Sequence, residues 1–407
     1  MRSRARADVS KTLPRTLLLL TLTHGLVDAF AAMVQPLWPD LQSSLAVNDA
    51  TMQGLFVLWN LATSVSQLAF GYWGDRARGR WMVWAGTAVA VIGMSMLGQA
   101  RSVPTLGALL VLSGLGVAAF HPEAAALAGA TAPRDRGRAM ALFSVGGYFG
   151  IVVGPLYSGI VTTRYGVPAL IWSIPWGLAL LAVLLTLTGR DRGSGGSAVD
   201  RPTAPPLSPV APVKGRGPTV GLLLLIGIFR TLPMTGVPLA MAYMLKARGG
   251  SNDQIGLAQA LFAAGVGAGS LGCAVLLRDV HERRALWSLP VLAAPWLLAC
   301  PFVNLAGLAA CVLVVGLLLG AAIPILTSYG QRLLHDAQRV ASALTMGVTW
   351  GVGGVLVAGL MAVLNHAGRP GLAFPVFTAA TFASGVLCLW LPRMEFARVE
   401  TRHPSTA

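Results

Sequence analysis

Charged residues are scarce in this chain of 407 residues. Asp, Glu, Lys and Arg together make up only 11% of it, while hydrophobic residues make up 55%. A water-soluble domain of this length needs more charge than that to cover its surface. The composition therefore excludes an ordinary soluble domain and indicates that a lipid bilayer solvates most of the chain.

Motifs of metal and nucleophile chemistry are also missing. The sequence contains no HExxH, no GxSxG and no CxxC pair, and its four cysteines all fall in apolar segments, at Cys273, Cys300, Cys311 and Cys388. HExxH is the pattern of a metalloprotease, GxSxG that of a serine hydrolase, and paired cysteines are typical of zinc and redox sites. We therefore expect no enzyme, no bound metal and no cofactor, and we interpret the cysteines as packing residues.

Long apolar segments are what the chain does have. A membrane-spanning helix needs about 20 apolar residues. The basic start of the chain followed by Leu17–Leu20 resembles a signal peptide, but no small-residue cleavage site follows, so we expect an uncleaved first helix. Twelve segments of spanning length are predicted, beginning near Thr16, Met52, Trp81, Pro104, Arg138, Val167, Val220, Gln254, Leu286, Leu305, Val340 and Gly371.

The distribution of basic residues gives the orientation. The net charge of +15 could indicate a nucleic-acid partner, but 24 of the 30 Lys and Arg residues lie in the N-terminal arm, the even-numbered loops and the C-terminal tail. Cytoplasmic loops of membrane proteins carry such an excess. We therefore predict that both termini are cytoplasmic and that the chain has no nucleic-acid partner.

A polar linker divides the helices six and six. Residues 189–218 are rich in Gly, Ser and Pro, so we expect a flexible cytoplasmic linker between a bundle over 1–188 and a second bundle with a tail over 219–407. An offset of 202 residues aligns Pro36 with Pro238 and Asp28 with Arg230. Because six helices return the chain to its starting side, this repeat is parallel.

The predicted fold is therefore an all-α membrane protein of twelve transmembrane helices in two parallel six-helix pseudo-repeats. That architecture is the major facilitator fold, in which the substrate binds near mid-membrane between the halves. The loop after the second helix, GYWGDRARGRW from Gly71 to Trp81, resembles the signature loop of that superfamily. Gly71 permits close helix approach and Asp75 can face a helix N-terminus, so we assign conformational gating to Gly71, Asp75, Arg76 and Arg80.

The fifth predicted helix carries small residues at helical spacing. Gly150, Gly154, Pro155, Ser158 and Gly159 resemble the GxxxGPxxGG pattern of proton-coupled antiporters, with serine in place of one glycine. Small residues let helices approach closely and proline supplies a bend. The same residues also suit an ordinary tight helix crossing. The resemblance favours export over uptake and assigns gating to Gly150, Gly154 and Pro155.

Two short motifs resemble the fosmidomycin-resistance subfamily of the major facilitator exporters. They are THGLVD, from Thr23 to Asp28, and FHPEAA, from Phe120 to Ala125; Arg230 in GIFRTLPMTG fits the same resemblance. The resemblance covers most of the chain outside the linker and the tails. It implies export of small molecules in exchange for protons, with the phosphonate fosmidomycin as the example that named the group.

His24 and Asp28 are candidate proton carriers. They are four residues apart and so share one helix face, and Asp28 lies roughly 18 Å from the cytoplasmic end at 1.5 Å per residue. A carboxylate at that depth costs on the order of 3 kcal/mol, so it faces a wet cavity, is paired, or is protonated for part of a cycle. A paired or permanently neutral structural aspartate remains the alternative.

Arg230 is the candidate substrate-binding cation. It occupies the corresponding depth in the second repeat, and a guanidinium cannot escape the membrane by losing its proton. Its anion could be Asp28, Glu123, or a phosphonate or carboxylate on a substrate. We hypothesise that Asp28 protonation and substrate binding compete for Arg230; a structural tie between helices is the alternative.

Four further polar residues are candidates. His121 and Glu123 flank Pro122, which frees a backbone carbonyl and allows a kink, so both are assigned to proton coupling. Positions two apart ordinarily point to different faces, and a role in tying helices together is the alternative. Asn60 and Gln67 lie seven apart on one helix face and are assigned to substrate binding.

The sequence thus predicts a proton-coupled exporter of a drug or of an anionic or amphipathic metabolite. An importer of a small organic anion and a non-transporting sensor of the same fold remain alternatives. Its expected partners are a small molecule, protons and the lipid bilayer, with the proton gradient as energy source. The Ala- and Arg-rich composition suggests the inner membrane of a bacterium, and the superfamily resemblance suggests a monomer.

Overall fold

Helices make up almost all of the structure, a computed structural model that describes residues 15–74, 81–131, 136–189, 217–276, 282–333 and 348–392. The first group of helices comprises α1 (Arg15–Ala32), η1 (Gln35–Leu37), α2 (Trp38–Ser44), α3 (Asp49–Ser64), α4 (Ser66–Gly74), α5 (Trp81–Ser95), η2 (Leu97–Gln99), α6 (Val103–Ala130), α7 (Arg136–Tyr165), η4 (Val167–Trp172) and α8 (Ser173–Gly189). The second comprises α9 (Gly217–Ala247), α10 (Asn252–Leu276), α11 (Glu282–Ala299), η7 (Cys300–Phe302), α12 (Leu305–Leu333), α14 (Thr349–His366), η10 (Pro370–Leu372), α15 (Ala373–Leu387) and η11 (Cys388–Trp390).

The predicted helical membrane fold is confirmed. Eleven stretches within the described residues are long and apolar enough to cross a membrane, and the shorter apolar helix Trp81–Ser95 is the twelfth. The start predicted near Val340 lies outside the described residues, and α14 is described from Thr349. Most of the predicted linker, residues 190–216, also lies outside them.

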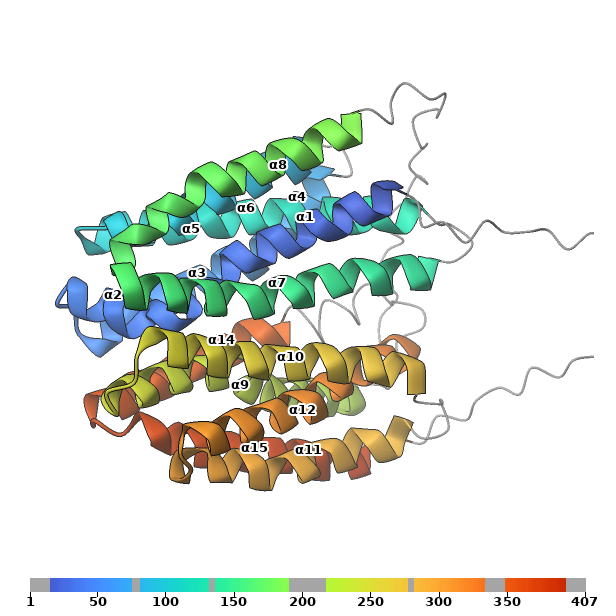
Figure 1. The fold of residues 1–407 in the computed structure, drawn as a ribbon. Helices are drawn as coiled ribbons and strands as arrows, with labels where there is room; N and C mark the ends of the chain where they lie inside the picture. The colour runs from blue at the N-terminus through green and yellow to red at the C-terminus, as the bar shows by residue number, and fades with distance from the viewer. Residues whose placement is uncertain are drawn as a thin grey trace, which may run out of the picture.

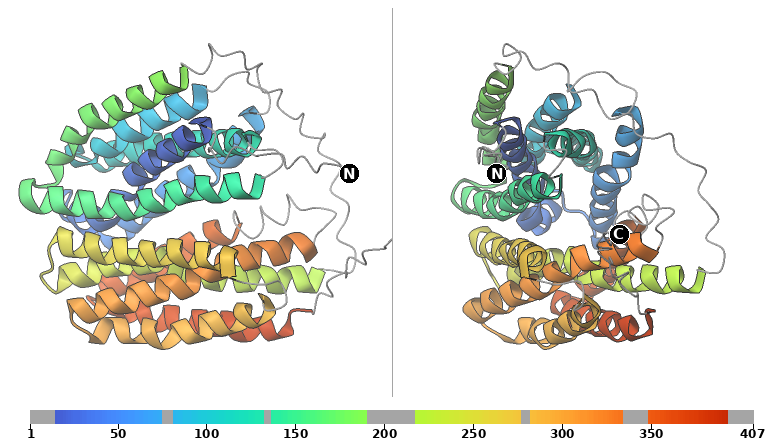
Figure 2. Two further views of the ribbon diagram at one scale, coloured as in Figure 1. Left: turned by 45° about the vertical axis from the view of Figure 1, so that its right-hand side comes forward. Right: turned by 90° about the vertical axis from the view of Figure 1, so that its right-hand side faces the viewer.

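The two groups of helices lie side by side as two bundles, α1 to α8 above and α9 to α15 below in Figure 1. Both views in Figure 2 separate them in the same way. The most extensive contacts between the bundles are those of α7 with α10 and of α3 with α14, and η1 and α2 add smaller contacts with α9 and α10. In each of the two main contacts, the second span of one repeat therefore meets the fifth span of the other.

Local sequence sets where these helices begin and bend. The Asn48 side chain accepts a hydrogen bond from the Thr51 backbone N–H at 2.8 Å, which caps the start of α3. Ser102 caps α6 in the same way. Prolines lie inside α6 at Pro122 and inside α7 at Pro155, where each removes one backbone hydrogen bond of the helix.

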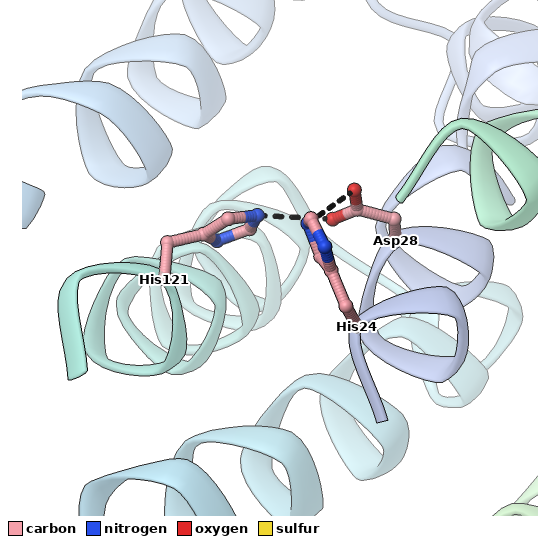
Figure 3. Close-up of side chains that lie close together, drawn as sticks. All are labelled: His24, Asp28 and His121. Atoms are coloured by element: carbon pink, nitrogen blue, oxygen red, sulfur yellow. Dashed lines mark ion pairs between the residues drawn. The ribbon is translucent and has the colours of Figure 1, made fainter. Parts of the chain in front are cut away.

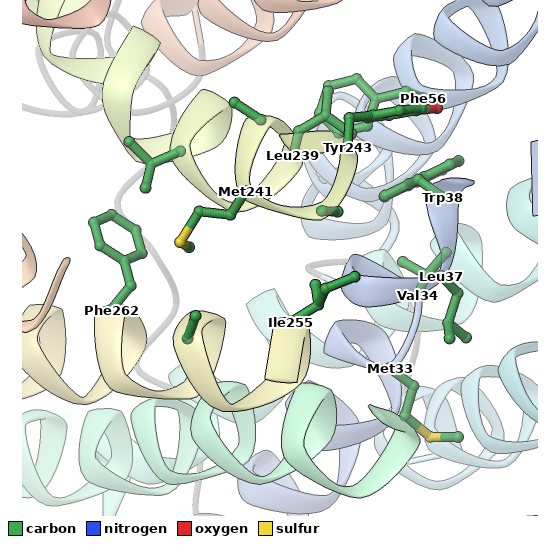
Figure 4. Packing of buried hydrophobic residues seen from close by; sticks show 14 of the residues in the cluster. Met33, Val34, Leu37, Trp38, Phe56, Leu239, Met241, Tyr243, Ile255 and Phe262 are labelled. Carbon is green, nitrogen blue, oxygen red and sulfur yellow. The ribbon is translucent and has the colours of Figure 1, made fainter. Parts of the chain in front are cut away.

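One apolar cluster crosses from one bundle to the other (Figure 4). Trp38 and Phe56 of the first bundle lie near Tyr243 and Leu239 of the second. These residues gather at the end of the molecule where α2 lies, which we call the α2 end. Burial of this apolar surface favours contact between the bundles at that end.

Candidate functional site

Two histidines and one aspartate form a buried cluster within the first bundle (Figure 3). The Nε2 atom of His24 lies 3.2 Å from one carboxylate oxygen of Asp28, and the Nε2 atom of His121 lies 3.2 Å from the other. His24 and Asp28 are one turn apart on α1, and His121 reaches them from α6. The Asp28 side chain is 12% exposed and that of His121 is 24% exposed, so His121 is the more accessible of the two.

Hydrogen bonds to the backbone fix which nitrogen of each imidazole carries a hydrogen. Nδ1 of His24 lies 2.8 Å from the Phe143 carbonyl oxygen, and Nδ1 of His121 lies 2.8 Å from the Val117 carbonyl oxygen. Because a carbonyl oxygen only accepts hydrogen bonds, both Nδ1 atoms are the donors. In a neutral imidazole, each Nε2 then presents a lone pair to the Asp28 carboxylate.

The cluster therefore needs additional protons to hold together. With none, two nitrogen lone pairs face two carboxylate oxygens at 3.2 Å, which is repulsive. One proton makes one Nε2–oxygen hydrogen bond and leaves the cluster neutral, and a second makes the other bond and a net charge of +1. The geometry makes the cluster a candidate site for binding and releasing protons.

The ligand atoms of the three residues also lie within 4.8 Å of one another, a spacing that a metal ion could use. Each carboxylate oxygen, however, faces a different imidazole, so the atoms form two separate hydrogen bonds rather than converging on one centre. The arrangement fits protons better than it fits a metal ion.

Helix α7 forms one wall of the cluster. The Phe143 ring stacks on the His24 imidazole at 4.1 Å between centroids and 18° between planes, in addition to the bond from His24 to its carbonyl. One turn further on, a Cβ built on Gly147 would lie 2.6 Å from Cε1 of His24 and 2.8 Å from Oδ2 of Asp28. Only a residue without a side chain fits there.

Gly147→Ala is expected to separate His24 from Asp28. The His24 ring is held by stacking and by its bond to Phe143, so it cannot yield without losing one of these contacts. We expect the pH-dependent activity of the protein to fall roughly ten-fold, the factor that corresponds to about 1.4 kcal/mol. Gly54→Ala is the matched control, because nothing lies within 4 Å of a Cβ at Gly54. Equal activity of the two variants would contradict this role of Gly147.

Arg230 lies in the second bundle and is 7% exposed. Its guanidinium donates to the carbonyl oxygens of Leu286 and, at 3.5 Å, Ala322, and to Sγ of Cys388 at 3.3 Å. Among the described residues, none accepts a hydrogen bond from its Nε. Arg230 also lines a pocket with Thr231, Met234, Ile323, Thr327 and Trp350. The cation is thus held by backbone oxygens and a thiol, beside a pocket of mixed character.

In this conformation Asp28 is bonded to histidines of its own bundle, while Arg230 is bonded within the second bundle. The competition between Asp28 and substrate for Arg230 stays a prediction. Glu123 is buried at 5% exposure, two residues from His121, and is not one of the three cluster residues. Asn60 and Gln67 each donate to their own helix, at the Phe56 and Thr63 carbonyls.

The predicted gating residues are placed as follows. Gly150 and Gly154 lie against α1, where a Cβ would come within 2.3 Å of the Gly25 carbonyl oxygen and 2.2 Å of the Ala29 carbonyl oxygen. The Pro155 carbonyl faces Gly256 of α10. Gly71 lies beside Pro122, with ordinary contact distances. Asp75, Arg76 and Arg80 lie outside the described residues.

Polar side chains also tie the bundles together at the α2 end. Lys246 lies 2.6 Å from an Asp40 carboxylate oxygen, and the Asn252 amide donates to the other at 2.6 Å. The Tyr243 hydroxyl donates to the Gln42 side chain at 2.8 Å. The sequence analysis did not single out these residues, although both Asp40 and Lys246 stand next to predicted loops. They join the two bundles at the α2 end.

Two helical bundles of repeated topology, enclosing buried ionisable side chains, define a polytopic membrane transporter. The family model for the Major Facilitator Superfamily matches residues 20–235. The chain belongs to this superfamily, whose members are transporters.

Individual relatives agree. The chain is 26% identical to the fosmidomycin resistance protein of Escherichia coli (strain K12) over 350 residues, 85% of this chain and 86% of that protein. It is 29% identical over 179 residues to the multidrug resistance protein MdtG of Serratia proteamaculans, 42% of this chain and 43% of that protein. A solved structure of a bacterial homologue of the human lysosomal transporter Spinster matches with a TM-score of 0.64 at 15% identity, covering 92% of this chain and 93% of that one.

Proposed function

We propose that this protein exports a small molecule from a bacterial cell in exchange for protons, by alternating access across the inner membrane. The observation that carries the proposal is the His24–Asp28–His121 cluster, whose two hydrogen bonds depend on exchangeable protons. The printed names of the relatives, fosmidomycin resistance and multidrug resistance, favour export over uptake.

The basic loops predict which side of the membrane each end faces. With both termini cytoplasmic, the α2 end faces outward, since α1 begins at Arg15 and reaches α2 after crossing the bilayer. The Asp40–Lys246 pair then closes the outer side. We assign this structure to a state closed to the outside, in which the cluster exchanges protons and the pocket exchanges substrate with the cytoplasm.

The surroundings of the Arg230 guanidinium favour an anionic or amphipathic substrate. No acidic side chain is bonded to its guanidinium among the described contacts, and its Nε is unbonded beside a pocket that also offers two threonines, a tryptophan and aliphatic side chains. A guanidinium in such a setting binds carboxylates and phosphonates well. The substrate anion would complete the coordination of Arg230 while its apolar part contacts Trp350 and Met234.

The test is transport by the protein reconstituted in liposomes that carry a lumenal pH dye. A panel of phosphonates, organic acids and cationic drugs is applied with and without an imposed pH gradient. Export by antiport predicts proton movement opposite to a labelled substrate. Movement of protons and substrate in the same direction would instead indicate an importer. If every compound that binds showed no flux, the protein would be a sensor. Either result overturns the proposal.

A further inference from the structure

Helix α7 stands between the proton cluster and the second bundle. Phe143 and Gly147, one turn apart, face the cluster. On the opposite side, α7 packs against α10. Any displacement of α7 that follows a change in the protons of the cluster therefore reaches the second bundle through the α7–α10 contact.

Tyr148, the residue after Gly147, forms one part of that contact. Its hydroxyl donates to Oγ of Ser270 on α10 at 2.9 Å. A Cβ built on Gly267 would lie 3.0 Å from Cβ and 3.1 Å from Cγ of Tyr148. Because Gly267 and Ser270 are three residues apart on α10, they share one face and receive the whole tyrosine side chain.

This bond differs in depth from the others that join the bundles. The remaining side-chain bonds between the bundles, in the part of the chain that the structure describes, lie toward the α2 end; they involve Gln35, Asp40, Gln42, Asp49, Gln53, Thr162 and Thr163 of the first bundle. Tyr148 instead lies 12 residues into α7 from its start at Arg136, roughly 18 Å along the helix. It is therefore at the depth of the cluster.

We propose that Tyr148 couples the proton occupancy of the cluster to the relative position of the two bundles through its bond to Ser270. The inference rests on the proposed function. Loss of the bond leaves proton binding in place but weakens its effect on the opening of the α2 end. Glu123 on α6 is the other ionisable group buried near the cluster, and on α10 the acidic residue is Asp253, at the α2 end, bonded to Thr163.

The test measures opening of the α2 end as a function of pH. Spin labels on the exposed residues 50 and 367 report their separation across the two bundles, in purified protein with Cys273 replaced by serine. The wild type is expected to change its ratio of open to closed protein between pH 8 and pH 5.5. Tyr148→Phe and Ser270→Ala are each expected to reduce that change about five-fold, the factor that corresponds to one neutral hydrogen bond. The double variant is expected to reduce it no further.

Tyr157→Phe is the matched control. Tyr157 lies on the same helix, and its hydroxyl lies at the same distance, 2.9 Å, from Oγ of Ser173, but this bond stays within the first bundle. A pH response of Tyr148→Phe and Ser270→Ala equal to that of Tyr157→Phe would overturn the inference. So would loss of proton uptake in both variants, which would make them parts of the proton site.

Failure of the proposed function gives a different result. A wild-type pH response in Asp28→Asn would show that the cluster is not the proton site and would reject the proposed function. A response lost in Asp28→Asn but intact in Tyr148→Phe would leave the proton site standing and reject only the coupling role of Tyr148.

Discussion

Asp28→Asn is expected to abolish transport driven by a pH gradient, with initial rates at least about 100-fold below wild type, equivalent to about 2.7 kcal/mol. Asparagine has nearly the shape of aspartate but takes up no proton in this pH range. Its amide can donate to one imidazole Nε2, while its oxygen still faces the lone pair of the other. The variant therefore folds but lacks the carboxylate charge that favours protons on the two imidazoles. The measurement is substrate-dependent dye response in liposomes.

Asp49→Asn is the control for this experiment. Asp49 is also a carboxylate in the first bundle, at the start of α3, and its side chain is 24% exposed at the α2 end. Its ion pair with the second bundle is a 4.0 Å contact with the exposed His366, so Asp49→Asn is expected to keep most of the wild-type rate. Gradient-driven transport that survives in Asp28→Asn would move the coupling site to Glu123, the other buried carboxylate nearby.

Arg230→Met is expected to weaken binding of anionic substrates by about 10- to 100-fold, the factor that a lost charge-assisted hydrogen bond of about 1.5–3 kcal/mol gives. Binding of neutral compounds should change little, because methionine fills most of the same volume. Arg230→Lys is expected to be intermediate at best, since one ammonium cannot reach the Leu286 carbonyl, Cys388 and a substrate with the geometry of a guanidinium. Titration calorimetry on purified protein measures these affinities.

Arg248→Met is the control for Arg230→Met. It tests whether the loss of any positive charge, and not only that of Arg230, weakens anion binding. Arg248 also donates to a backbone carbonyl, that of Pro301, but it is exposed. Its replacement should leave anion binding unchanged. If Arg230→Met bound anions as tightly as Arg248→Met did, Arg230 would be a structural tie between helices and not a substrate ligand.

The fold could be predicted from the sequence because the patterns that indicate it extend over many residues. Spans of apolar residues and the alternation of basic loops involve many positions each, and a single odd residue does not change them. The third span is an example. Its helix, Trp81–Ser95, is shorter than the other spans, yet the sequence correctly predicted that it begins at Trp81.

The site was predicted in its residues but not in its arrangement. Spacing placed His24 and Asp28 on one face of a helix, and the structure confirms that neighbourhood. It could not say that His121, 93 positions further along, shares the carboxylate, because helix rotation depends on packing between α1, α6 and α7. Nor could the sequence show that Arg230 donates to the backbone carbonyls of Leu286 and Ala322, because sequence patterns do not display where backbone groups lie.

Gly147 and Tyr148 illustrate the same limit. The notable glycines of α7 follow a four-residue spacing, and Gly147 stands outside that spacing, so its contact with His24 and Asp28 appears only in three dimensions. The contact of Tyr148 with Ser270 depends on how two bundles meet, which no local pattern encodes.

Proton release on substrate binding tests the central claim most directly. Purified protein in a weakly buffered solution is mixed with a saturating anionic substrate, and the protons released are counted with a pH dye. The account predicts release by the wild type and by Asp49→Asn, and none by Asp28→Asn. Binding of substrate without any release by the wild type, or equal release by Asp28→Asn, would contradict the exchange of protons at the His24–Asp28–His121 cluster.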